Sequence, residues 1–216
     1  MDNILRLVGV FGFLPLAVVY LFTYSKNAHN RPYVFFCLYL CSITVINTVS
    51  GLMAMNRINN LIFSHVYFVI EFITLIFFFR ELLNKKQRNK IDITVIVVFI
   101  ALLSLFGFHG LDMYNLKPFD PLEILLCSLP ILVFSAMHLY NSISAPLKFI
   151  YVTIGLVVYK IVSILLFMVL NFANTNGNNY RDFLDLLWTL NRYFLVVYFG
   201  LIFFEWYRNY MRMKVD

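Results

Sequence analysis

Charged residues are scarce in this chain of 216 residues: Asp, Glu, Lys and Arg make up 13% of it, whereas 62% is hydrophobic and 19% aromatic. A soluble domain is about a quarter charged and about half apolar, so the composition excludes an ordinary water-soluble globule. A disordered or nucleic-acid-binding tail is also excluded, because such segments do not combine 24 Phe with so few charges. We therefore predict a membrane protein and expect no nucleic-acid partner.

Cysteine is scarce as well, with three residues in the whole chain. Cys37 and Cys41 lie one helical turn apart in an apolar run, and Cys127 lies in another. This spacing fits neither a disulfide framework nor a zinc site, which needs four convergent ligands. We interpret all three as small core residues and expect no metal and no cofactor.

Long polar segments and catalytic motifs are missing too. The longest connection between apolar runs is roughly 15 residues, too short for an appended kinase, nucleotidase or DNA-binding domain. No G-x-S-x-G elbow and no Gly-rich phosphate loop occurs in the sequence. Asp2 and Arg6 precede the first apolar run without a small-residue cleavage site, so we expect a retained span and a single domain over 1–216.

Long hydrophobic runs are what the chain has in abundance. About 20 apolar residues span the hydrocarbon core of a bilayer, and in lipid such a segment must be helical to bond its own backbone. The predicted fold is therefore an all-α, polytopic membrane protein with seven transmembrane helices. The predicted spans are 7–24, 33–55, 61–79, 93–109, 124–140, 149–170 and 186–204. Polar, Gly-containing and Pro-containing segments connect them, at 25–32, 56–60, 84–90, 117–121 and 174–179.

The Lys and Arg residues predict the orientation. One side of the membrane carries four of them: Arg6, Arg57, Lys117 and Arg181. The other side carries eleven: Lys26, Arg31, Arg80, Lys85, Lys86, Arg88, Lys90, Lys148, Arg208, Arg212 and Lys214. Because positive residues accumulate in cytoplasmic connections, we predict a multi-pass protein of the plasma (inner) membrane. Its N-terminus would lie outside and its C-terminus in the cytoplasm.

A weak internal repeat relates the first three predicted helices to the last three. Leu14-Pro15 precedes Pro32, and Leu129-Pro130 precedes Pro146 at nearly the same spacing. Phe77-Phe78-Phe79-Arg80-Glu81 and Ile202-Phe203-Phe204-Glu205 end the third and seventh helices alike. With the fourth helix as a linker, the two halves would form a 3+1+3 parallel repeat. The alternative is coincidence, since Pro is frequent in membrane helices.

This pattern resembles the SWEET/PQ-loop superfamily, whose architecture the KDEL receptors share. The segment Pro121-Leu122-Glu123-Ile124-Leu125 is similar to one that opens the fifth helix of those receptors. The resemblance implies the 3+1+3 fold for most of the chain. It implies no site residues, because Leu16 and Ile131 follow the two prolines where the superfamily has Gln, and the second helix contains no Arg.

Three charges fall at the depth of the bilayer centre: Glu71, Lys160 and Arg192. Each costs at least about 2.5–3.5 kcal/mol to insert, so such residues are functional candidates. Pairing one acid with one base leaves a cation over, which favours a pocket for a small anionic or polar ligand. The alternative is a structural cluster in which a buried ion pair fixes helix packing.

Polar residues recur on one face of several predicted helices. Ser64, Tyr67, Glu71 and Thr74 share a face, as do Thr153, Lys160 and Ser163. Lipid cannot satisfy such faces, so they should line an interior cavity. The predicted ligand-binding residues are Glu71, Lys160, Arg192, Asn47, Trp188, Tyr67 and Ser163.

Three functions are compatible with these features. The first is a small-solute carrier or solute-binding protein, in which helices 1–3 rock against helices 5–7 around a net-cationic midplane site. The second is a membrane sensor or interaction subunit that contacts a cytoplasmic or membrane partner through the basic segment 80–90 and the tail 205–216. The third is a membrane-embedded lipid-modifying enzyme using His65 and His109, although no nucleophile–base or metal constellation supports it.

Overall fold

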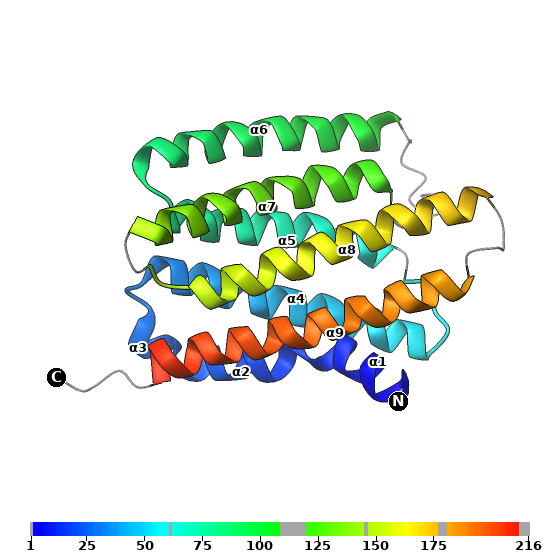
Figure 1. Cartoon of the computed structure of the whole chain (residues 1–216), viewed down its shortest axis with the longest axis horizontal. Helices are drawn as coiled ribbons and strands as arrows, with labels where there is room; N and C mark the ends of the chain where they lie inside the picture. The colour runs from blue at the N-terminus through cyan, green and yellow to red at the C-terminus, as the bar shows by residue number, and fades with distance from the viewer. Residues whose placement is uncertain (1, 61, 109–119, 145–146, 177–180, 212–216) are drawn as a thin grey trace.

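The structure is a computed structural model that describes residues 2–60, 62–108, 120–144, 147–176 and 181–211. In these ranges every regular element is helical (Figure 1). The α-helices are α1 (Asp2–Phe11), α2 (Phe13–Phe22), α3 (Tyr24–Asn27), α4 (Arg31–Met55), α5 (Ile62–Leu82), α6 (Lys85–Phe108), α7 (Pro121–Ser144), α8 (Ile150–Asn176) and α9 (Arg181–Trp206). A π-helical turn, Tyr207–Met211, follows α9.

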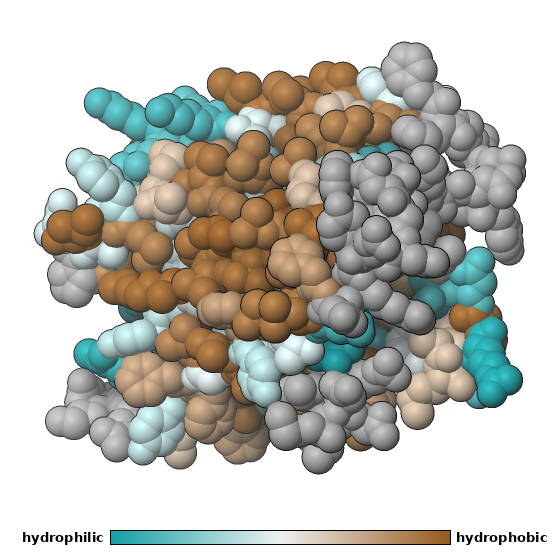
Figure 2. All heavy atoms as spheres, turned by 45° about the vertical axis from the view of Figure 1, so that its right-hand side comes forward, coloured by the Kyte–Doolittle hydropathy of each residue, from teal (hydrophilic) through white to brown (hydrophobic). Residues whose placement is uncertain are grey.

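The described helices support a multi-pass membrane protein. Six of them are long and apolar enough to cross a bilayer, namely α4 to α9, and Leu7–Phe22 forms a shorter apolar stretch. Figure 2 shows the resulting hydrophobic belt over the middle of the bundle, with hydrophilic side chains toward its ends. The predicted helical membrane class is thus confirmed.

The first predicted span is broken in the structure, at Gly12 between α1 and α2. Pro15 explains the break, because it has no N–H for the carbonyl of Phe11 and its ring crowds that carbonyl. Gly12 also lies against α9: a Cβ added there would be 2.2 Å from Cε2 of Phe199. The absence of a side chain at Gly12 therefore lets Phe199 of α9 pack closely at this point.

The predicted connection at 84–90 is wrong, because α6 already begins at Lys85. Asn84 and Gln87 cap this helix reciprocally: the Gln87 N–H donates to Oδ1 of Asn84 at 3.1 Å, and the Asn84 N–H donates to Oε1 of Gln87 at 3.3 Å. Lys, Gln and Arg are good helix formers, so polarity alone did not mark the end of a helix. The predicted connections at 117–119 and 177–179 lie outside the described residues.

Six helices form a closed ring. Around it, α2 contacts α4, α4 contacts α5, α5 contacts α7, α7 contacts α8, α8 contacts α9, and α9 contacts α2. The helix α6 lies outside the ring against α5 and α7, as the uppermost helix of Figure 1. Its outer face exposes Ile93, Ile96, Val97, Phe99, Ile100 and Leu103, as expected of a lipid-facing helix.

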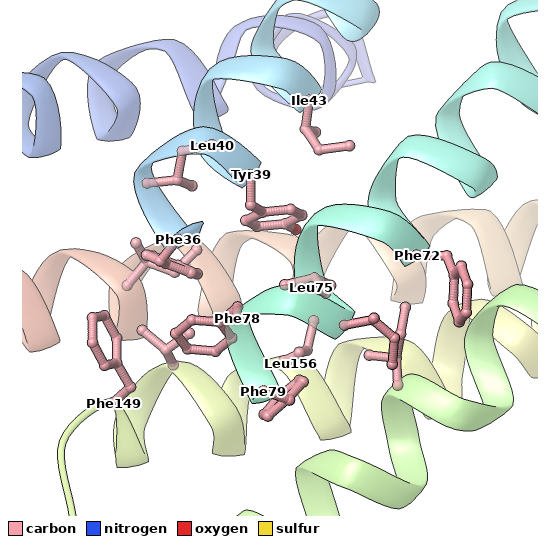
Figure 3. Close-up of a cluster of buried hydrophobic side chains, with 14 of the residues drawn as sticks. Phe36, Tyr39, Leu40, Ile43, Phe72, Leu75, Phe78, Phe79, Phe149 and Leu156 are labelled. Carbon is pink, nitrogen blue, oxygen red and sulfur yellow. The ribbon is translucent and has the colours of Figure 1, made fainter. Parts of the chain in front are cut away.

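One half of the ring is filled by aromatic side chains. Phe36, Phe78 and Phe149 come from different segments and meet with ring centroids 5.1–5.5 Å apart (Figure 3). All three side chains are fully buried. This core lies toward the C-terminal end of the bundle, which holds the α5–α6 turn and Met211 (Figure 1).

Glu205 joins the end of α9 to the start of α8. Its buried carboxylate accepts the backbone N–H of Phe149 at 2.7 Å and that of Tyr151 at 3.2 Å. A carboxylate suits this position, because the first N–H groups of a helix have no partner within it. Phe149 has a φ of 64°, a strained conformation for a non-glycine residue, and its N–H is held by this contact.

Candidate functional site

A cavity of about 270 Å³ lies inside the ring, toward the end that holds the N-terminus and the α4–α5 turn. Helices α1, α2, α4, α5, α8 and α9 all contribute to its wall. It is lined by Gly9, Phe13, Ile46, Asn47, Ser50, Asn60, Phe63, Ser64, Tyr67, Phe68, Tyr159, Ser163, Phe167, Trp188, Asn191 and Leu195. The lining is therefore mixed, with amides, hydroxyls and aromatic rings.

Helical spacing places these side chains on the inner faces of the ring. On α8, Tyr159, Ser163 and Phe167 follow one another at four-residue intervals and so share a face. On α9, Trp188 and Asn191 are three residues apart and do the same. The two faces meet where the rings of Phe167 and Trp188 pack edge-to-face, with centroids 6.2 Å apart.

A buried ion pair lies next to the cavity, toward the middle of the bundle. The ammonium of Lys160 on α8 donates to Oε2 of Glu71 on α5. Their side chains are 2% and 1% exposed, respectively. Tyr67, which lines the cavity, donates its hydroxyl to Oε1 of Glu71 at 3.4 Å. The pair is thus connected to the cavity through Tyr67.

Beyond the ion pair, the C-terminal half of the ring is closed. The indole N–H of Trp206 donates to Oγ1 of Thr23 at 2.9 Å, and that oxygen lies 2.6 Å from the hydroxyl of Tyr33. The Tyr20 hydroxyl donates to the carbonyl of Ile202 at 3.3 Å. These contacts tie α2 and α4 to α9, and together with the aromatic core they form what we call the C-terminal plug.

The structure brings most of the predicted site residues together. Asn47, Tyr67, Ser163 and Trp188 line the cavity, whereas Glu71 and Lys160 form the adjacent ion pair. The remaining one, Arg192, is half-buried and is not part of the cavity lining. The charged trio thus separates into a neutral pair and an arginine elsewhere.

The cavity is also lined by Asn191, Ser50 and Asn60, which are not among the predicted site residues. Asn191 precedes Arg192, which was predicted as a site residue because of its charge. Neighbouring side chains on a helix point about 100° apart, so Asn191 and Arg192 cannot both face the cavity. The periodicity from Trp188 could have identified Asn191, which lies three residues further on.

A second buried polar pair joins α5 to α7. Nδ1 of His65 contacts Oε2 of Glu123, and both side chains are almost fully buried. His65, which the enzyme alternative would use, thus joins the first turn of α5 to Glu123 on α7. His109 lies outside the described residues. Within the described part of the chain, no three His, Cys, Asp or Glu side chains are placed to hold a metal ion.

The basic segment at the C-terminal end is partly neutralised by acids. Arg80 Nε donates to Oδ1 of Asp92 at 2.7 Å, and Arg88 lies 3.8 Å from a carboxylate oxygen of Glu81. Lys85 and Lys86, in the first turn of α6, are exposed. Lysine ammonium groups at a membrane surface attract anionic lipid headgroups.

No family model, no curated protein and no solved structure matches the chain. The resemblance to the SWEET/PQ-loop superfamily therefore stays a prediction.

Proposed function

We propose that this protein is a small-solute carrier or solute-binding protein of the plasma (inner) membrane, and that the central cavity is its site. The observation that carries the proposal is the position of the cavity. It lies between helices of the ring, lined by α2, α4, α5, α8 and α9, has a polar and aromatic lining, and is separated from the C-terminal end by the plug. Concave, mostly apolar cavities with a few polar groups between helices are typical ligand sites.

The carrier mechanism is a rocking of two halves around the cavity. One half is α1 to α5 and the other is α7 to α9, with Leu7–Phe22 counted as the first of seven spans in a 3+1+3 repeat. The polar contacts that cross the seam between the halves include His65–Glu123, Glu71–Lys160, Tyr20–Ile202 and Thr23–Trp206. Alternating access about a fixed central site would break the last two and leave the Glu71–Lys160 pair as the pivot.

Opening the plug would break hydrogen bonds and separate aromatic rings. Each of its hydrogen bonds contributes about 0.5–1.5 kcal/mol, and each aromatic pair about the same beyond its burial. The two hydrogen bonds Trp206–Thr23 and Tyr20–Ile202 therefore sum to about 1–3 kcal/mol. The pairs of Phe149 with Phe36 and Phe78 also cross the seam and add to this cost, which a ligand would have to offset by preferring the open state.

Water access to the cavity tests the proposal without knowledge of the ligand. In a background with Cys37, Cys41 and Cys127 replaced by Ala, Asn47→Cys places a thiol in the cavity lining. The matched control, Val45→Cys, lies two residues away on α4, where the native side chain is 61% exposed toward lipid. Both variants are treated in oriented vesicles with a charged, membrane-impermeant methanethiosulfonate.

The proposal expects the Asn47→Cys variant to react from the outside, the side of the N-terminus, and the Val45→Cys variant to stay unmodified. A thiol in hydrocarbon does not form the reactive thiolate. Equal labelling of the two variants, or none of Asn47→Cys from either side, would refute a water-filled central site. Uptake of a radiolabelled solute panel into proteoliposomes then separates a carrier from a binding protein.

A second candidate, an interaction subunit, is favoured by the exposed Lys85 and Lys86 at the start of α6. Such a chain would associate with a cytoplasmic or membrane partner through the segment 80–90 and the tail 205–216. Neutralising Lys85 and Lys86 with Gln would abolish co-purification of the partner, whereas a carrier would keep its uptake rate.

A further inference from the structure

The chemistry of the cavity wall restricts what the cavity can hold. Among the described residues, none of those lining it is Asp, Glu, Lys, Arg or His. Its polar groups are the amides of Asn47, Asn60 and Asn191, the hydroxyls of serine and tyrosine, and the indole N–H of Trp188, all of them uncharged. An ion moved from water into such a place would lose hydration without gaining a counter-charge, which is strongly unfavourable.

The nearest charges do not change this conclusion. Glu71 and Lys160 neutralise each other, and both are buried away from the cavity surface. The group that reaches them from the cavity is the neutral Tyr67 hydroxyl. A ligand that separated this pair would have to compensate two desolvated charges at once.

One buried polar atom in the wall lacks a partner. Asn191 is 7% exposed, and its Oδ1 accepts no hydrogen bond within the described chain. By contrast, the amide nitrogen of Asn60 is already occupied, because it donates to the carbonyl and the hydroxyl of Ser50 at 3.1 and 2.9 Å. An unsatisfied buried acceptor costs about 1–3 kcal/mol. Protein atoms cover this oxygen in the structure, so a ligand N–H or O–H would remove the cost once the Asn191 amide turns toward the cavity.

Aromatic rings line the same cavity as Asn191. Phe68 packs on Phe167 with centroids 5.6 Å apart and planes at 87°, and Phe167 packs on Trp188 at 89°. Trp188 is one turn from Asn191 on the same face of α9. Rings at right angles offer both faces and edges to a flat apolar group.

We infer that the cavity binds an uncharged solute that has a flat apolar face and donates a hydrogen bond to Oδ1 of Asn191. This inference rests on the proposed function and adds the substrate class. It replaces the anionic ligand expected from the three midplane charges with a neutral one.

Matched probes test the charge, the donor and the flat face separately. Nicotinamide and benzamide are uncharged, planar donors, and nicotinate and benzoate are their anionic counterparts. N,N-dimethylnicotinamide keeps the ring and the carbonyl but has no N–H, and propionamide keeps the amide but has no ring. Each is added at millimolar concentration to the purified full-length protein, and the shift in Tm reports binding to the folded state.

We expect nicotinamide or benzamide to raise the Tm, and the anions, the donor-free amide and propionamide to do so less. Asn191→Leu should weaken the apparent Kd of the binding amide by about tenfold. Its Tm without ligand should stay equal to or exceed that of the unsubstituted protein, because the unsatisfied oxygen is gone. Thr189→Val is the control on the same helix, since the Thr189 hydroxyl donates to the carbonyl of Asp185 at 2.8 Å. That variant should bind the amide normally.

Four results would overturn the inference: no shift with either planar amide, a larger shift with the anions, equal binding of the dimethyl amide, or a marked loss of Tm in ligand-free Asn191→Leu. Thiol labelling of Asn47→Cys measures the access of water to the cavity and needs no ligand. If Asn47→Cys is labelled but the amide probes do not bind as expected, the uncharged substrate class alone is rejected. If Asn47→Cys is not labelled, the proposed function itself is rejected.

Discussion

The buried pair of Glu71 and Lys160 leads to a quantitative prediction. Its side chains are 1% and 2% exposed, so removing one partner leaves the other desolvated and unpaired. Such a loss destabilises a protein by about 3–5 kcal/mol, whereas replacing both partners by apolar residues is often neutral or stabilising. Lys160→Met and Glu71→Leu should each be strongly destabilising, and the double variant should recover most of the loss.

Thermal unfolding of the detergent-purified protein measures this effect. For a chain of this size, 1 kcal/mol corresponds to about 2–4 °C in Tm, so each single variant should lose about 6–20 °C. The double variant should melt within a few degrees of the unsubstituted protein. Double-mutant cycles are the appropriate analysis, because contacting residues are not additive.

The surface pair Arg80–Asp92 provides the control. It has a good hydrogen-bond distance of 2.7 Å but both side chains are solvent-accessible, so Arg80→Gln should leave the Tm almost unchanged. If the losses of the two single variants instead add up in the double variant, the charges do not interact in the folded protein. The assignment of a buried pair next to the cavity would then be wrong.

Three further substitutions test the contacts between helices. Glu205→Ala leaves the buried N–H of Phe149 and the partly buried N–H of Tyr151 without acceptors. We expect a loss of about 1–3 kcal/mol from the buried group in thermal unfolding and less from the other, and Glu205→Gln should lose less in total. Gly155→Leu should lower the Tm, because a Cβ at this position would lie 2.8 Å from Cδ2 of Tyr198. Gly200→Ala is the control and should leave the Tm unchanged, because no atom lies within 4 Å of a Cβ added there. Trp206→Phe removes the hydrogen bond to Thr23, worth about 1 kcal/mol, and should increase labelling of cavity thiols from the C-terminal side roughly fivefold.

The fold class could be predicted from the sequence because lipid imposes a simple length rule on apolar helices. The ends of the helices could not be predicted in the same way, since the length rule does not say whether a polar residue next to an apolar run continues the helix or ends it. The segment 84–90 was predicted as a connection, yet the Asn84–Gln87 cap starts α6 at once. The break at Gly12 depends on Pro15 and on the approach of Phe199 from a distant helix.

The candidate site was partly predictable for a similar reason. Polar periodicity selected Asn47, Tyr67, Ser163 and Trp188, which share the cavity. It could not tell Asn191 from Arg192, because the rotation of α9 about its axis is set by packing against α8 and α2. Polar periodicity also does not indicate whether Lys160 or Arg192 pairs with Glu71, since that depends on which helix lies opposite α5 in the ring.

The neutrality of the Glu71–Lys160 pair has a consequence for the response to membrane potential. One elementary charge moved across the whole membrane changes the energy by about 2.3 kcal/mol per 100 mV. The pair has no net charge whichever partner holds the proton, and the described residues that line the cavity are uncharged. Rocking of the halves around an uncharged ligand should thus move almost no net charge at the ion pair or in the cavity. Of the three charges predicted at the bilayer centre, Arg192 on α9 then remains to respond to the potential, so the rate of uptake should differ little between polarised and depolarised vesicles.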